Sequence, residues 1–171
     1  MQQPNPASGK GANAAIDIAA SQREVWTVLA DIASWPTWNP AVRHAVCDRE
    51  PEDGLEVGTR FRFSTEIGTL KCRVTHVDAP RTLSWKGRVL VLGERQTWNV
   101  ERGRAGTRVS VHAEMTGLAA RLIRRRLDDR LQRVLDALVQ LLRLEAEARA
   151  VEEQEDAARL AEQEGRQKPS G

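Results

Sequence analysis

The segment VWTVLADIASWPTWNP, residues 25–40, decides the fold, because it joins an amphipathic helix directly to a tryptophan-rich corner. Its apolar side chains recur at spacings of three and four, which places them on one buried stripe of a helix. Ser21 is followed three residues later by Glu24, the pattern of a capping box at a helix start. The sequence therefore predicts a helix that begins after Ser21 and buries Val25, Trp26, Leu29 and Ile32.

A tight corner follows this helix. Pro36 and Pro40 bracket Trp38 and Asn39, and proline ends regular helix within a residue or two. Three of the five tryptophans of the chain lie within thirteen residues here. We expect these rings to close one end of the domain.

The composition indicates one domain with polar tails. A chain of 171 residues is long enough to bury a core without metal or disulfide support. The net charge of +2 divides into a body of +6 and an acidic tail of −4 from Glu145 onward, too little to indicate a nucleic-acid-binding protein. We expect a disordered leader at 1–12, a domain at 13–145, and a charged helical extension with a frayed tail at 146–171.

The sequence also favours a cytoplasmic protein. Cys47 and Cys72 lack CxxC spacing and are expected to be reduced thiols. The N-terminus has no apolar core of the secretory type, and no run approaches the ~20 apolar residues that cross a bilayer.

Between residues 42 and 115 the apolar pattern has a period of two, which indicates β-strands. Turn residues separate the runs at short intervals, so the strands should form an antiparallel meander. The expected strands are 14–18, 42–48, 59–66, 70–77, 82–88, 95–101 and 107–115.

After Gly117 the period becomes helical. Leucines recur on one face from Leu118 through Leu122 to Leu142, which predicts a single helix over residues 117–144, about 42 Å long. Beyond residue 145 the sequence keeps helix-forming residues but has little to bury, so an unbroken helix would extend past the domain.

Several short motifs, in this order and spacing, resemble the polyketide cyclase/dehydrase-like group of the START-like (SRPBCC) superfamily. They are WPTWNP at 35–40, LEVGT at 55–59, VDAPRTLSW at 77–85, GTRV at 106–109, and Glu114 leading to Gly117-Leu118. The resemblance implies an α+β helix-grip fold, in which a curved antiparallel sheet of about seven strands wraps a long C-terminal helix around a hydrophobic cavity. It says little about function, since this superfamily includes carriers, enzymes and receptors on one scaffold.

Strand alternation selects the residues that would line such a cavity, while the cavity itself is an implication of the resemblance. The alternative is that the same side chains pack on the C-terminal helix as a solid core. In the segment 87–93 four aliphatic residues lie between glycines, and they are either a gate over a ligand or ordinary core of two longer strands. The predicted ligand-binding residues are Phe61, Phe63, Trp85, Val89, Leu90, Leu92, Gln96, Trp98, Val109 and Val111.

Catalytic signatures are absent from the sequence. The three histidines fall on different predicted strands, so neither a metal site nor a cofactor is expected. A polyketide cyclase would need a general acid or base inside the pocket. Candidates are His44, His76, His112, Glu66 and Glu114, with Arg62 or Arg73 to stabilise an oxyanion.

The leading hypothesis is therefore binding or transport of a small hydrophobic ligand, such as a lipid, isoprenoid or polyketide-like compound, without chemistry. The alternative is a polyketide cyclase or dehydratase that uses the same cavity. Contact with a membrane surface through the 87–93 segment or the arginines of the C-terminal helix, and a homodimer through that helix, are further hypotheses. No nucleic-acid partner is expected, because no aromatic stacking platform accompanies the basic residues.

Overall fold

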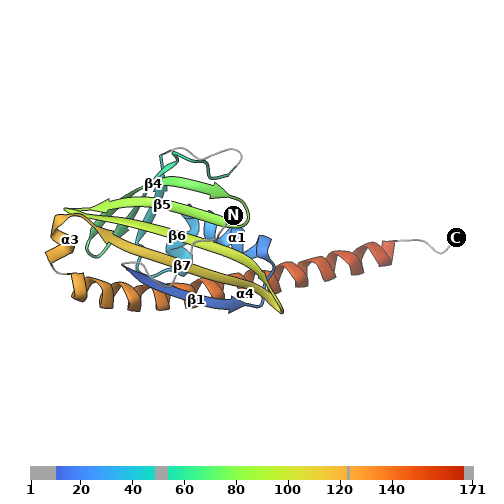
Figure 1. Cartoon of the computed structure of the whole chain (residues 1–171). Helices are drawn as coiled ribbons and strands as arrows, with labels where there is room; N and C mark the ends of the chain where they lie inside the picture. Colours follow the sequence, from blue (N-terminus) through green and yellow to red (C-terminus); the bar gives the residue numbers. More distant parts are fainter. Residues whose placement is uncertain (1–10, 49–53, 123, 168–171) are drawn as a thin grey trace.

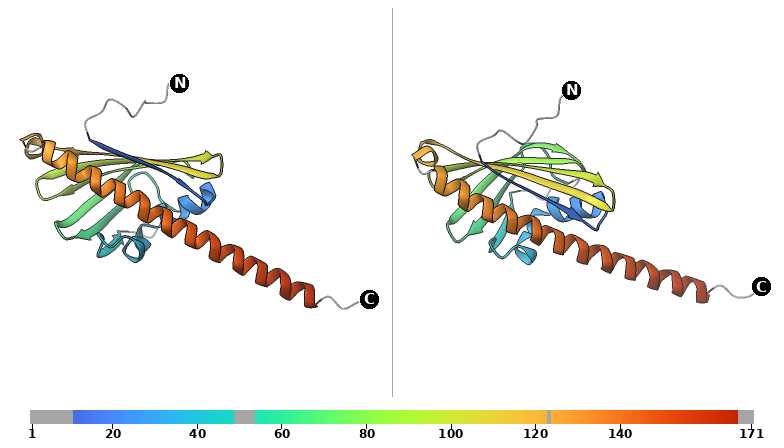
Figure 2. Two further views of the ribbon diagram at one scale, coloured as in Figure 1. Left: turned by 90° about the horizontal axis from the view of Figure 1, so that it is seen from below. Right: turned by 60° about the horizontal axis from the view of Figure 1, so that its bottom comes forward.

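The computed structural model describes residues 11–48, 54–122 and 124–167. These residues form a seven-stranded curved sheet in the order β1-β7-β6-β5-β4-β3-β2, with every neighbouring pair antiparallel. Helices α1, α2 and α4 lie against one face of the sheet (Figures 1 and 2). We call this the inner face and the opposite one the outer face. The predicted α+β helix-grip fold is confirmed.

The strands follow the alternation of the sequence closely. Along each strand, alternate residues are mostly buried on the inner face, and the residues between them lie exposed or half-buried on the outer face. The strands are β1 Ala12–Ile18, β2 His44–Cys47, β3 Arg60–Thr65, β4 Gly68–Asp78, β5 Thr82–Val89, β6 Leu92–Gly103 and β7 Gly106–Thr116.

The β5–β6 hairpin is tighter than the sequence predicted. Val89 pairs with Leu92 across a two-residue turn, so β6 begins three residues before the predicted start at residue 95. Val89 is buried and Leu92 half-buried, whereas Leu90 and Val91 at the turn are exposed. Both strands therefore extend into this segment, as the core interpretation expects, while Leu90 and Val91 lie in solvent at the turn.

The helix at residues 22–30 begins as its capping box predicts. In α1 (Gln22–Ala30) the Ser21 side chain accepts a hydrogen bond from the Glu24 backbone N–H, and the Glu24 carboxylate accepts from the Ser21 N–H. The one-turn helices η2 (Ile32–Ser34) and α2 (Trp35–Trp38) then form the tryptophan corner. Trp35 and Trp38 are both buried there, with ring centroids 4.8 Å apart.

Removal of the cap should weaken the fold measurably. Replacing Ser21 by alanine removes the acceptor for one N–H of the first turn, and we expect the free energy of unfolding to fall by about 1 kcal/mol. Urea unfolding followed by circular dichroism measures the loss. Ser21→Asp keeps an acceptor oxygen and serves as the control; equal losses in the two variants would contradict the capping argument.

The C-terminal region differs from the single helix predicted over 117–144. It contains a short helix, α3 (Leu118–Leu122), and a 44-residue helix, α4 (Arg124–Gln167). Leu118 and Leu122 were predicted on the buried face, but they are 80% and 87% exposed. The prediction was wrong because α3 lies at the end of the sheet, beside β6 and β7, and not beneath it (Figure 1). We call this the α3 end of the sheet; the β3–β4 and β5–β6 turns lie there too.

Helix α4 buries one stripe and then leaves the domain. Its buried side chains recur at helical spacing and pack on the inner side of the domain, chiefly against β1, α1 and β7. From residue 151 to 163 every side chain is exposed, and the helix extends past the sheet (Figures 1 and 2). The buried residues are Leu135, Leu138, Val139, Leu142, Ala146 and Ala150.

Side chains of α4 also form hydrogen bonds with backbone groups at the free edge of β1. The Gln132 amide accepts from the Asn13 N–H at 3.2 Å and donates to the Asn13 carbonyl at 2.7 Å. Glu147 accepts from the Ala19 N–H, just after β1, at 2.9 Å. The backbone of an edge strand is thereby bonded to a helix.

Parts of the predicted tails cannot be compared with the structure. Residues 1–10 of the predicted leader and residues 168–171 of the predicted tail lie outside the described residues. Within the described ranges, no helix has both the length and the apolar character needed to span a bilayer.

Candidate functional site

The structure places nine of the ten predicted ligand-binding residues on the inner face, and Leu90 in the exposed β5–β6 turn. Leu92 is half-buried at the α3 end. The other eight are buried, with at most 6% of their surface exposed: Phe61, Phe63, Trp85, Val89, Gln96, Trp98, Val109 and Val111.

The aromatic members form a packed cluster around Trp35. The Trp35 ring stacks on Phe63 at 4.9 Å and meets Trp85 and Trp98 edge-on at 6.0 and 6.4 Å. Phe61 contacts Phe63 and Trp85 at 5.1 and 5.6 Å. These separations are those of direct ring contact, so the middle of the inner face is occupied by protein side chains.

Side chains of the inner face are less completely buried towards the α3 end. One cross-strand row there runs from Phe61 through Cys72, Gly87 and Glu94 to Met115. Phe61 and Cys72 are buried, but Glu94 and Met115 are only half-buried, as is Leu92 in the next row. A carboxyl group therefore lies among apolar side chains on the inner face, beside the aromatic cluster.

Glu94 belongs to a short polar chain. With the Gln96 amide oriented to satisfy both neighbours, its Nε2 donates to Glu94 Oε1 at 2.9 Å and its Oε1 accepts from Trp98 Nε1 at 3.1 Å. Glu94, Gln96 and Trp98 alternate on β6, which puts all three on the inner face. The buried indole thus orients the amide, and the amide orients the carboxyl group.

The Glu94 carboxyl group has a strongly displaced pKa. Burial raises its pKa from 4.5 to about 7, because the charged form loses hydration. Within the part of the chain that the structure describes, no cation pairs with it. Near neutral pH the group is therefore present in both protonated and ionised forms, which allows it to donate or accept a hydrogen bond and to transfer a proton.

Gly87, opposite Glu94 on β5, is closely packed by two side chains. A Cβ atom at this position would lie 2.9 Å from Leu70 Cδ1 and 3.0 Å from Cys72 Sγ. Burial, with a smaller contribution from the Glu94 charge, raises the pKa of the Cys72 thiol, so Cys72 stays a neutral, apolar neighbour. The surroundings of Glu94 on this side are consequently apolar.

The acid/base candidates chosen from the sequence lie elsewhere. Strand register puts His44, His76 and His112 on the outer face, opposite Ser64, Ser84 and Thr97. Glu66, at the β3–β4 turn, pairs with Arg43 at 3.5 Å, and Glu114 on the outer face pairs with Arg95 at 3.6 Å. The two proposed oxyanion stabilisers, Arg62 and Arg73, are exposed on the outer face as well.

Glu94 was missed because the predicted strand began at residue 95. The signal was present: Glu94 precedes Gln96 and Trp98 at the same spacing of two, and both were assigned to the interior. A strand extended by one residue would have placed a carboxyl group on the inner face.

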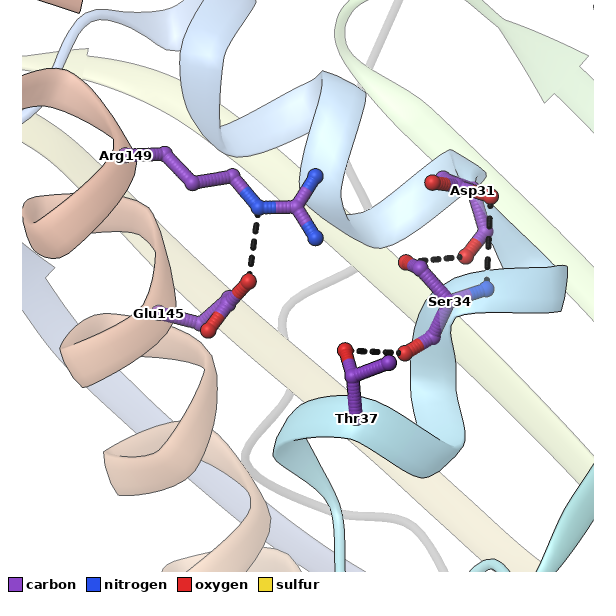
Figure 3. Close-up of polar contacts among 5 residues, drawn as sticks. All are labelled: Asp31, Ser34, Thr37, Glu145 and Arg149. Atoms are coloured by element: carbon purple, nitrogen blue, oxygen red, sulfur yellow. Dashed lines mark hydrogen bonds and ion pairs between the residues drawn. The ribbon is translucent and has the colours of Figure 1, made fainter. Parts of the chain in front are cut away.

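A surface pocket of about 390 Å³ lies between η2 and β2, away from the predicted residues. Its charged member, Asp31, caps η2: the Asp31 carboxylate accepts from the Ser34 N–H at 3.3 Å, and the Ser34 hydroxyl donates to the Asp31 carbonyl at 2.9 Å. Figure 3 shows these contacts, with the Glu145–Arg149 ion pair of α4 facing this corner. Because Asp31 serves the fold, the pocket offers little chemistry. Its lining is Ala30, Asp31, Ile32, Ala33, Ala45, Val46, Cys47, Gly54 and Leu55.

Comparison with known proteins supports the assignment of the fold. A family model described as "Polyketide cyclase / dehydrase and lipid transport" matches residues 12–143, well over half of the chain. No curated protein matches this sequence.

Solved structures with low sequence identity share the fold. A hypothetical protein from Helicobacter pylori has a TM-score of 0.64 and 16% identity, covering 88% of this chain and 99% of that one. The Zhui aromatase/cyclase from Streptomyces sp. R1128 has a TM-score of 0.61 and 17% identity, covering 81% and 93%. A START superfamily protein from Mycobacterium smegmatis has a TM-score of 0.59 and 14% identity, covering 82% and 97%.

Proposed function

Because the chain belongs to the polyketide cyclase/dehydrase and lipid transport family, we propose that it binds a small hydrophobic molecule at the α3 end of the inner face. The ligand carries one polar group, a carbonyl or hydroxyl, that hydrogen-bonds to Glu94. A lipid, an isoprenoid or a polyketide-like compound fits this description. The observation that carries the proposal is a half-buried carboxyl group among apolar side chains, with which no cation of the described residues forms an ion pair.

The apolar neighbours of Glu94 supply the affinity in this proposal. Val89, Leu92 and Met115 lie in the same or the adjacent cross-strand row and would cover the ligand, and Gln96 holds the carboxyl group in place. Burial of ligand surface contributes roughly 25 cal/mol per Å². Leu90 belongs to the rim. The remaining predicted residues, Phe61, Phe63, Trp85, Trp98, Val109 and Val111, form the packed wall beside the site.

One observation favours catalysis as the second candidate function: the pKa of Glu94 is raised to about 7, close to the value that suits a general acid or base. In a dehydration, the carboxylate would take a proton from the carbon next to a ligand carbonyl as the C–OH bond breaks. The same carboxyl group would return that proton to the departing hydroxide, which leaves as water, and a C=C bond forms.

Binding of the neutral fluorescent probe N-phenyl-1-naphthylamine tests the proposed site. We expect the wild-type protein to bind the probe and Leu92→Trp to lose binding at least about tenfold, because the larger ring fills space beside Glu94. Leu144→Trp, at an exposed position of α4, is the matched control and should bind as the wild type does. Equal affinity in the two variants would refute this location.

Displacement of the probe by fatty acids, isoprenoid alcohols and aromatic phenols would then rank the ligand classes. In Glu94→Gln, retained probe binding together with lost turnover of a β-hydroxyketone would identify an enzyme. No turnover in the wild-type protein would leave the binding function alone.

Two wider predictions accompany this proposal. A cytoplasmic location agrees with the buried Cys72 thiol. A homodimer through the C-terminal helix would use the exposed segment of α4, whose apolar seam is thin: Ala157, Leu160 and Ala161 continue the stripe of the buried Ala150.

A further inference from the structure

Exposed aliphatic side chains concentrate at the α3 end of the sheet. Five of the exposed large apolar residues come from three neighbouring segments there, with exposures between 58% and 87%. A Cβ on Gly68 would meet Val89 at 3.5 Å, and one on Gly117 would meet the Val91 carbonyl at 3.5 Å, so the segments adjoin. We call Ile67, Leu90, Val91, Leu118 and Leu122 the apolar tip.

The presence of leucine in the turn at the centre of the apolar tip does not favour folding. Leu90 has a φ of +52°, a left-handed conformation that glycine or asparagine adopts more easily in two-residue hairpin turns. A leucine here carries both a conformational cost and the cost of exposure. Insertion of the Leu90 side chain into an apolar medium would offset these costs and would explain why leucine is present.

Behind the apolar tip, the outer face of the sheet carries rows of like charge. In the register of the strands, Arg62 pairs with Lys71 and Lys71 with Arg88, in a row that lies two residues from Leu90. The next row is also cationic. It comprises Arg60, Arg73, Lys86 and Arg95, on four successive strands.

Like charges directly opposite one another destabilise a sheet, and most of these are not compensated. Asp48 pairs with Arg62 at 3.3 Å, and Glu114 pairs with Arg95 at 3.6 Å. In the described ranges the other five cations of the two rows form no ion pair: Arg60, Lys71, Arg73, Lys86 and Arg88. A net positive surface thus borders an exposed apolar one.

We propose that the α3 end is a docking surface for an anionic lipid bilayer. The apolar tip would enter the boundary between headgroups and acyl chains, which accepts apolar side chains to a depth of about 5–10 Å. The first cationic row lies two residues, roughly 7 Å, behind the turn. Long arginine and lysine side chains at this distance reach the level of the phosphates.

A soluble polyanion would match the cations but would leave the apolar tip in water, so the bilayer is the better partner. The inference does not depend on the proposed ligand site.

Sedimentation with lipid vesicles tests the docking surface in the full chain. We expect binding to vesicles that contain phosphatidylglycerol in phosphatidylcholine, and weak binding to phosphatidylcholine alone. Neutralising Lys71→Gln and Arg88→Gln together should weaken partitioning about 25-fold, since each cation near an anionic surface contributes roughly fivefold. Arg102→Gln with Arg104→Gln, exposed at the opposite end of the sheet, makes the same change in net charge and should bind as the wild type does.

A second pair of variants tests the apolar tip without straining the fold. Leu90→Asn with Val91→Thr suits the turn and should weaken vesicle binding at least about tenfold. Leu160→Asn with Val151→Thr, on the exposed part of α4, is the control. Absence of binding to anionic vesicles would overturn the proposal, as would equal binding by either variant and its control.

Heparin binding distinguishes a soluble polyanion from a membrane. Heparin affinity that depends on Lys71 and Arg88, combined with vesicle binding that is insensitive to the apolar tip, would overturn the bilayer in favour of a soluble partner. Lys71→Gln with Arg88→Gln lies on the outer face and should bind the probe as the wild type does, so failure of the ligand site and failure of the docking surface give different results.

Discussion

Replacing Trp98 by alanine is expected to lower the free energy of unfolding by about 3–5 kcal/mol, the range observed when a buried tryptophan or phenylalanine is truncated. Trp98 has none of its surface exposed and lies at the centre of the inner face. Its ring contacts Trp35 and Trp85, both at 6.4 Å between centroids. The loss combines transfer of the indole to water with a void that neighbouring rings cannot close.

The same change also leaves a buried acceptor without its donor. The Gln96 side-chain oxygen accepts from the Trp98 indole, and an unsatisfied buried acceptor costs about 1–3 kcal/mol. Urea unfolding at constant temperature, followed by far-ultraviolet circular dichroism, measures the total. Trp26→Ala is the matched control: Trp26 is only half-buried at the edge of the core, so its loss should be clearly smaller. Similar losses at the two positions would contradict the central role of the cluster.

Replacing Glu94 by glutamine is expected to stabilise the protein above neutral pH, by on the order of 2–3 kcal/mol. The pKa of Glu94 is about 7 in the folded state and 4.5 without the fold. Between these values the folded protein binds more protons than the unfolded chain, so stability falls as pH rises from 4.5 through 7. Above 7 the penalty is complete, and an uncharged glutamine does not incur it.

Unfolding measurements across this pH range test the prediction. The difference between Glu94→Gln and wild type should be small near about pH 4.5, grow up to about pH 7, and then level off. Glu114→Gln on the outer face removes only a partly exposed ion pair and should change the free energy of unfolding by less than about 1 kcal/mol. A Glu94→Gln variant that is no more stable than wild type at high pH would show that Glu94 is well hydrated.

Much of the fold could be predicted because the local patterns agree with the tertiary structure. The alternation at Phe61 and Phe63, and at Gln96 and Trp98, set both the strands and the face that each buries, and the structure keeps both. The capping box at Ser21 set the start of α1 to the residue. In each case the residues that the local pattern selects are the ones that the folded domain requires at those positions.

The parts that were predicted wrongly depend on position relative to the whole domain. Leu118 and Leu122 continue the leucine spacing of α4, but spacing cannot show that the sheet ends before the helix passes beneath it. Glu94 depends on where β6 begins, and the two-residue turn that decides this has leucine where glycine is usual. The function is the property that the sequence predicts least well, since one scaffold of this kind serves many ligands.

The hydrogen bonds from Gln132 and Glu147 to the border of β1 have a consequence for behaviour at high concentration. An unpaired strand border is a template on which another molecule can add its own strand, the first step towards polymers and fibrils. Here α4 side chains hydrogen-bond the backbone near both ends of one edge strand, at Asn13 and Ala19, and on the other side the edge strand β2 has only four residues. The protein therefore offers foreign chains few backbone groups to pair with, and should resist fibril growth even when crowded.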